Sequence, residues 1–109
     1  MSVRAYSSYS RKAVALLGKM ISAYRKERKI TTQDLADRAG ISRTTLQKIE
    51  KGGMKSEIGI VFEVAALVGI RLFDMDSISL DSIEEKFDNK IALLPKSIRA
   101  SKKDVEDAF

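Results

Sequence analysis

The first third of the chain carries apolar residues at helical spacing. Between positions 13 and 24 they recur at i, i+3, i+4, i+7, i+8 and i+11, which predicts a helix with one face turned to a core. Ser10 is a suitable N-cap for this helix, and its end is expected near Lys29. The apolar positions are Ala13, Leu16, Leu17, Met20, Ile21 and Tyr24.

Between Thr31 and Glu50 the pattern changes to two short helices joined by a tight turn. Thr31 and Ser42 are good N-caps for them, and Asp34 is placed to complete a capping box with Thr31. Gly40 suits the end of the first helix because glycine tolerates a positive φ. The second helix then presents polar side chains outward. The residues expected to face the core are Leu35, Ala36, Leu46 and Ile49.

A loop with two glycines, Gly52 and Gly53, comes next, and we expect them to let the backbone approach a phosphate closely. A fourth helix is then predicted over residues 58–68, opened by Ser56 or Glu57. Its side chains are apolar nearly all round, which indicates burial on both sides. A strand is the alternative reading, but the length of the segment favours a helix.

The rest of the chain is more polar. Residues 71–75 predict a short fifth helix or a turn, and residues 76–82 are turn-like with some strand-like alternation. A last helix is predicted over residues 82–93, and Pro95 stops it. The tail over residues 96–109 is charged and has no apolar period, so we expect it to be flexible.

The apolar surface of residues 58–73 exceeds what one small core requires. One side of the predicted fourth helix must meet the domain core. The other side must be covered by a second copy of the chain, which predicts a homodimer. The alternative is that the helix over residues 82–93 folds back and covers this surface within one chain. The residues expected at the dimer interface are Ile60, Phe62, Leu67, Leu72 and Phe73.

Composition narrows the chemistry. The chain has no cysteine and no histidine, which excludes disulfides, thiolate metal sites and histidine-based catalysis. The remaining carboxylates form no convincing pair, so we expect no enzyme activity, no metal site and no cofactor. No apolar run approaches the roughly 20 residues that span a bilayer, and the N-terminus lacks a signal-peptide core. We therefore expect a cytoplasmic protein with no membrane partner.

Charge is divided unevenly between the two halves of the 109 residues. Residues 1–55 contain 13 Lys and Arg against 4 Asp and Glu, whereas residues 56–109 contain 7 against 11. The net charge of +5 is thus the difference between a basic first half and an acidic second half. A basic surface that coincides with the two short helices favours binding to phosphates. A merely solvated basic face is the alternative.

The string QDLADRAGISRTTLQKIEKG, at residues 33–52, resembles the phage-repressor and Cro type of helix-turn-helix, the XRE family. The resemblance covers about residues 13–73 and implies that the second short helix lies in a DNA major groove. It also implies that Arg25 pairs with Glu50, which would aim the arginine at a phosphate. The alternatives are a helical hairpin that binds only protein, and a basic helix end without a partner.

The polar outer face of the second short helix predicts individual roles on palindromic operator DNA. Base edges are expected to be read by Arg43, Thr44 and Lys48, with Thr45 and Gln47 at the margin of the site. Phosphates are expected to contact Arg25, Thr32, Gln33, Ser42, Lys51 and Lys55.

The fold class that follows is all-α: a five-helix, phage-repressor-like helix-turn-helix domain, with an additional C-terminal helix and a flexible tail. The expected divisions are an N-terminal arm (1–9), the DNA-binding domain (10–75), a helical extension (76–95) and the tail (96–109).

Segments outside the helix-turn-helix resemble the HipB-like antitoxins that accompany HipA-type kinases. The resemblance rests on GKMISAYRKER, VAALVGIRLF, ALLPKSIR and the ending KKDVEDAF. It implies an antitoxin of a type II toxin–antitoxin module, associated with the bacterial nucleoid, that binds a HipA-type Ser/Thr kinase. The residues expected to bind this partner are Asp104, Val105, Glu106, Asp107 and Phe109. The alternatives are a stand-alone XRE-family regulator and a tail that only aids solubility.

Overall fold

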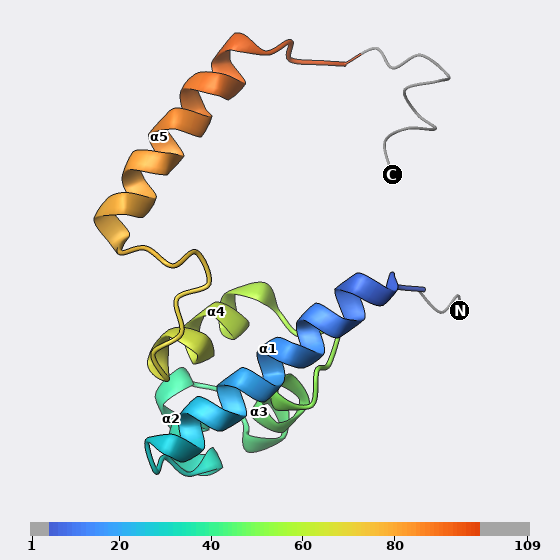
Figure 1. The fold of residues 1–109 in the computed structure, drawn as a ribbon, viewed down its shortest axis with the longest axis vertical. Coiled ribbons are helices and arrows are strands. Elements are labelled where there is room, and N and C mark those ends of the chain that lie inside the picture. The colour runs from blue at the N-terminus through green and yellow to red at the C-terminus, as the bar shows by residue number, and fades with distance from the viewer. Residues whose placement is uncertain (1–4, 99–109) are drawn as a thin grey trace. The chain divides into compact units, whose positions relative to one another are not determined.

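The computed structural model describes residues 5–98, which contain five α-helices and no strand (Figure 1). The helices are α1 (Ser8–Glu27), α2 (Thr32–Ala39), α3 (Arg43–Glu50), α4 (Ile58–Leu67) and α5 (Ser77–Leu93). The predicted all-α class is confirmed. The chain divides into two units, the first ending at Asp74 and the second beginning at Met75.

The first helix begins earlier than predicted. Ser7 is the N-cap of α1, and its hydroxyl accepts a hydrogen bond from the Ser10 backbone N–H at 3.1 Å. Ser10 therefore lies within the first turn, and the expectation that it caps the helix was wrong. The helix ends at Glu27, and the left-handed backbone of Lys29 (φ 56°) turns the chain toward α2.

One core holds the first unit together. Within it, α1 packs on α3, and α2 packs on both α3 and α4 (Figure 1). Burial of these apolar side chains is the main force that stabilises the four helices. The fully or nearly buried apolar residues are Ile21, Leu35, Ala36, Leu46, Ile49, Val64, Ala65, Val68 and Ile70.

The buried face of α1 differs from the predicted stripe at its N-terminal end. Ala13 is exposed and Leu16 is 59% exposed, so these two were wrongly assigned to the core. The buried positions are instead Gly18, Ile21 and Arg25, at intervals of three and four. The apolar pattern did not identify Gly18 and Arg25, because neither residue has an apolar side chain.

Helix α4 is covered by the core on one side only. Val64 and Ala65 are buried, while Ile58 is 75% exposed. On the exposed side, the rings of Phe62 and Phe73 stack with their centroids 6.0 Å apart. Of the residues expected at a dimer interface, Ile60 and Leu67 pack partly against the core, and Phe62, Leu72 and Phe73 are exposed.

The segment after α4 resolves two open expectations. Residues 71–75 form a turn, closed by a hydrogen bond from the Asp74 N–H to the Arg71 carbonyl oxygen at 3.0 Å. The turn-like or strand-like expectation for residues 76–82 was wrong, because α5 begins at Ser77. Asp76 caps this helix by accepting a hydrogen bond from the Ser79 N–H at 2.8 Å. No residue of α5 is buried.

Two remaining expectations concern the ends of the chain and membranes. The five tail residues expected to bind a partner, Asp104, Val105, Glu106, Asp107 and Phe109, lie outside the described residues. Among the helices of residues 5–98, none is long and apolar enough to cross a membrane.

Candidate nucleic-acid interface

The turn between α2 and α3 is built from local hydrogen bonds. The Thr31 hydroxyl accepts from the Asp34 N–H at 3.0 Å, and Gly40 ends α2 with a φ of 70°. The Ser42 hydroxyl accepts from the Thr45 N–H at 3.0 Å and donates to the Thr45 hydroxyl at 2.9 Å. Both predicted caps and the left-handed glycine are confirmed. The Asp34 carboxylate forms an ion pair with Arg38 at 3.0 Å.

Helix α3 is held by its inner face. Leu46 is fully buried and Ile49 is 4% exposed, as the apolar pattern predicted. Residues three apart lie on the same face of a helix, so Leu46 and Ile49 both point to the core and the opposite face of α3 is left to solvent. That outer face displays Arg43, Thr44 and Lys48, all exposed.

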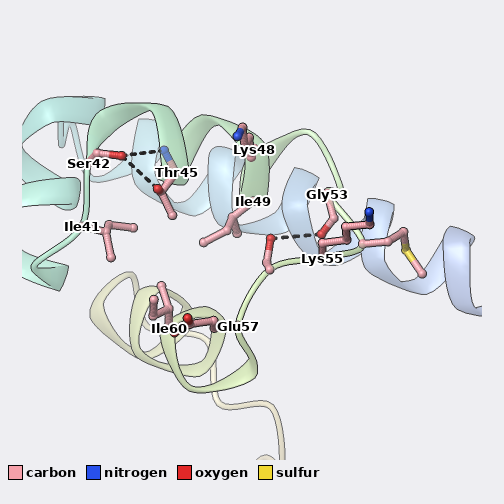
Figure 2. Close-up of a pocket in the computed structure, with 11 residues that line it drawn as sticks. Ile41, Ser42, Thr45, Lys48, Ile49, Gly53, Lys55, Glu57 and Ile60 are labelled. Carbon is pink, nitrogen blue, oxygen red and sulfur yellow. Dashed lines mark hydrogen bonds between the residues drawn. The ribbon is translucent and has the colours of Figure 1, made fainter. Parts of the chain in front are cut away.

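The other two predicted base-reading residues are less accessible. Gln47 is partly exposed, and Thr45 is partly buried with its hydroxyl engaged by Ser42. Thr45 also lines the groove between α3 and α4 (Figure 2). The structure thus brings Arg43, Thr44 and Lys48 together on the exposed face and sets Thr45 at its margin.

Arg25 and Glu50 form the ion pair implied by the family resemblance. Arg25 Nε and Nη2 donate to the two Glu50 carboxylate oxygens at 2.8 and 3.0 Å, and Nη1 donates to the Ile30 carbonyl oxygen at 3.0 Å. Arg25 is 8% exposed. The hydrogen bond with Glu50 raises the pKa of Arg25, against an opposing effect of burial. Three of the five guanidinium N–H donors are therefore used inside the fold.

The other residues expected to bind phosphate lie at helix N-termini and in one loop. Thr32 and Gln33 begin α2, and Gln33 donates to the Asp37 carboxylate at 2.9 Å. Lys51 and Lys55 are exposed in the loop after α3. Helix N-termini and flexible lysines both suit phosphate oxygens, so this arrangement is compatible with a DNA backbone along one face.

The two loop glycines are required by packing, and their close approach to a phosphate stays a prediction. A Cβ on Gly52 would lie 3.0 Å from Ala15 Cα, and one on Gly53 would lie 2.9 Å from the Lys48 carbonyl oxygen. The Gly53 N–H donates to that same carbonyl oxygen at 2.8 Å. The loop is thus folded tightly against α1 and the end of α3.

Gly18 was missed by the sequence analysis. A Cβ at this position would lie 2.6 Å from the Ile49 carbonyl oxygen and 2.7 Å from that of Glu50. The backbone of α1 therefore crosses directly over the last turn of α3. The available signal was a glycine inside a helical pattern, which disfavours the helix unless packing requires it.

An open groove of about 610 Å³ between α3 and α4 was also not anticipated (Figure 2). Apolar side chains form much of its walls, and Lys48 and Lys55 lie at it as well. Because its walls come from separate helices, no local sequence pattern predicts this groove. The lining residues are Ile41, Ser42, Thr45, Lys48, Ile49, Gly53, Met54, Lys55, Ser56, Glu57 and Ile60.

Comparison with known proteins agrees with this geometry. The helix-turn-helix family profile matches residues 21–74. An uncharacterized HTH-type transcriptional regulator from Methanocaldococcus jannaschii is 35% identical over 52 residues, which cover 48% of this chain and 79% of that protein. The chain belongs to the XRE-type helix-turn-helix family. Members of this family are DNA-binding transcriptional regulators, and α3 occupies the position of the recognition helix. Helix α5 lies outside the matched residues.

Proposed function

We propose that this XRE-type regulator is a repressor that binds palindromic operator DNA as a dimer, with α3 of each copy in the major groove. The observation that carries the proposal is the division of α3 into two faces. Leu46 and Ile49 fix the helix in the core, while Arg43, Thr44 and Lys48 remain exposed. A helix anchored in this way can enter a groove without losing any contact that holds it.

The roles of the side chains follow from their chemistry. Arg43 suits a guanine, because its guanidinium can donate two parallel hydrogen bonds to O6 and N7. Thr44 and Lys48 contact neighbouring base edges, with Gln47 and Thr45 at the margin of the site. Phosphates on either side bind to Thr32, Gln33, Ser42, Lys51 and Lys55. Arg25 supports these phosphate contacts indirectly, because its ion pair with Glu50 holds the end of α3 in place.

Dimerisation is proposed because an operator of two half-sites requires two recognition helices. The half-sites would lie about one DNA turn, roughly 34 Å, apart. Phe62, Leu72 and Phe73 are exposed apolar residues that a second copy can cover, and Ile60 and Leu67 are partly buried against the core. Binding of the purified protein to DNA from upstream of its own gene tests the proposal. A protein that binds this DNA no more tightly than random DNA contradicts it.

We further propose that this regulator acts in the cytoplasm, on nucleoid DNA, as the antitoxin of a type II module. Its partner would be a HipA-type Ser/Thr kinase. This proposal rests on the HipB-like segments and on the chain beyond Asp74, which forms a unit of its own outside the family match. Asp104, Val105, Glu106, Asp107 and Phe109 would order on the kinase. Acidic side chains suit a protein partner better than DNA, whose phosphates repel them.

Co-expression with the product of the neighbouring gene tests this second proposal. The full chain and a version ending at Pro95 are each compared for co-purification and for relief of toxicity. If neither form does either, the protein is a stand-alone XRE-family regulator. If both perform equally, the kinase is a partner but the tail does not anchor it.

A further inference from the structure

Helix α5 carries a continuous apolar stripe. Leu80, Ile83, Phe87 and Ile91 follow one another at intervals of three, four and four residues, and Leu94, which caps the helix, extends the row. These five side chains are between 37% and 65% exposed. Leu80 and Ile91 are 11 residues apart, as are Ile83 and Leu94, so the row stays nearly straight along the helix. We call these five residues the α5 stripe.

Charges of opposite sign border the two sides of the α5 stripe. Lys86 and Lys90 each stand one position before a stripe residue, whereas Glu84 and Asp88 each stand one position after one. Successive residues are rotated by about 100°, so the lysines form one flank and the acids form the other. Lys90 Nζ lies 6.0 Å from the centre of the Phe87 ring, which places this lysine at the edge of the stripe.

This segregation of charge disfavours an isolated helix. Glu84 and Asp88 are four residues apart, as are Lys86 and Lys90, and like charges at this spacing repel. The ion pairs found among residues 5–98 are Arg25–Glu50 and Asp34–Arg38, so none of these four charges is paired within α5. The arrangement becomes favourable when opposite charges approach each flank.

A second copy of the same helix supplies those charges in one orientation. When two such helices face each other in parallel, two-fold symmetry places the basic flank of one against the acidic flank of the other. In the antiparallel orientation, basic meets basic and acidic meets acidic. Charges beside an apolar seam are the positions that set partner and direction in paired helices.

From this pattern we propose that α5 pairs in parallel with α5 of a second copy, along the α5 stripe. The proposal deepens the dimeric operator binding proposed above and names a surface for it, but it rests on α5 alone. Parallel pairing also brings both amino-terminal ends of α5, and hence both connections to Asp74, to the same end of the pair. Two recognition units joined in this way can address one operator.

Charge reversal tests the pairing in the full-length protein. In one variant, Lys86→Glu and Lys90→Glu make both flanks acidic. In the other, Glu84→Lys and Asp88→Lys make both flanks basic. By sedimentation equilibrium, each should dimerise about tenfold more weakly than the unaltered chain, because every flank contact becomes repulsive. An equimolar mixture of the two should recover dimerisation. Glu85→Lys, on the opposite face of α5, is the control and should leave the dimer unchanged.

Single cysteines test the direction, since the chain contains none of its own. In a parallel pair, Ile83→Cys and Ile91→Cys each meet their own copy, so each protein alone should form a disulfide-linked dimer on mild oxidation. In an antiparallel pair only a mixture of the two would cross-link efficiently, and that result would overturn the proposal. Circular dichroism of each protein checks that the total helix content is unchanged.

The remaining outcomes are also decisive. If the protein stays monomeric at the highest concentration, the α5 stripe is covered by its own chain or by another protein. This result overturns the pairing. A dimer that neither pair of charge reversals weakens would assemble through another surface, such as Phe62 and Phe73, and also overturns it. Failure to bind any operator, with the pairing intact, would overturn only the proposed function.

Discussion

Arg25 and Glu50 join α1 to the last residue of α3 through two nearly parallel hydrogen bonds of 2.8 and 3.0 Å. Both side chains are about nine-tenths buried. Arg25 also donates to the Ile30 carbonyl oxygen, so one guanidinium ties together α1, the connection before α2 and the end of α3. The end of the recognition helix is therefore fixed to α1 by a contact within the fold.

Removing one partner of this ion pair should destabilise the fold strongly. Glu50→Gln leaves the Arg25 charge buried without its counter-charge, and we expect a loss of about 3 kcal/mol in the free energy of unfolding. Denaturation in urea measures it. The exposed pair Asp34–Arg38 provides the control, because Asp34→Asn should cost less than about 0.5 kcal/mol. Equal losses in the two variants would contradict the role given to burial.

The contribution of this pair should not depend on pH in the neutral range. Glu50 raises the pKa of Arg25 above its usual value, so the guanidinium is charged in both folded and unfolded protein. A raised pKa contributes stability below the unfolded pKa and loses it only as pH rises through the folded one. We therefore expect the stability difference between the native chain and Arg25→Met to stay constant from pH 7 to pH 9, as measured by thermal unfolding.

Gly18→Ala should destabilise the protein although alanine favours helices. The added methyl group would lie 2.6 Å from the Ile49 carbonyl oxygen and force α1 away from α3, at a cost of about 1–3 kcal/mol. Gly59→Ala is the matched control, because that helical glycine has open space at its Cβ position. This second change should stabilise the fold by up to about 1 kcal/mol. A stabilising effect at both sites would show that the close crossing of α1 and α3 is wrong.

Substitutions of Ser42 should separate folding from DNA binding. Ser42→Ala removes the cap of α3 and should cost about 1 kcal/mol of stability. Ser42→Asp keeps a capping oxygen but adds a negative charge beside the proposed phosphate contact. We expect near-native stability and weaker operator binding for the aspartate variant, measured by thermal unfolding and fluorescence anisotropy. Unchanged operator affinity for Ser42→Asp would remove Ser42 from the interface.

Arg43→Ala should weaken binding to operator DNA more than binding to random DNA. The loss of one two-pronged contact to a guanine should cost about 1–3 kcal/mol on the operator. Lys55→Ala is the comparison, because a phosphate contact should weaken both DNAs equally and lower the salt slope by about one unit. Titrations at several salt concentrations measure both effects. Equal losses on the two DNAs for Arg43→Ala would exclude base reading.

The parts of the fold that the sequence predicted are those with local causes. Thr31, Gly40 and Ser42 act within three residues of themselves, so their roles follow from residue type and position. The choice of Ser10 over Ser7 as the N-cap of α1 was wrong because both serines satisfy the same local rule. In α5, the alternation of polar and apolar residues over 77–80 concealed the start of the helix, although Asp76 was a recognisable N-cap.

The parts that could not be predicted depend on contacts between distant segments. Gly18 is required because α1 crosses α3, and no local pattern specifies that crossing. The groove between α3 and α4 and the exposure of Leu16 likewise depend on how helices are placed in space. The Arg25–Glu50 pair was found through the family resemblance, since two positions 25 apart in the sequence carry no local signal of contact.

The separation of the two faces of α3 has a consequence for how this regulator evolves. The side chains of Arg43, Thr44 and Lys48 take no part in the hydrogen bonds and ion pairs found among residues 5–98. Under the proposed role in base reading, mutations there would change which DNA is preferred without removing a hydrogen bond or ion pair found among residues 5–98. A duplicated gene could therefore acquire a new target within a few substitutions, while the matching operator changes in step. The two regulators would then act in one cell without binding each other's operators.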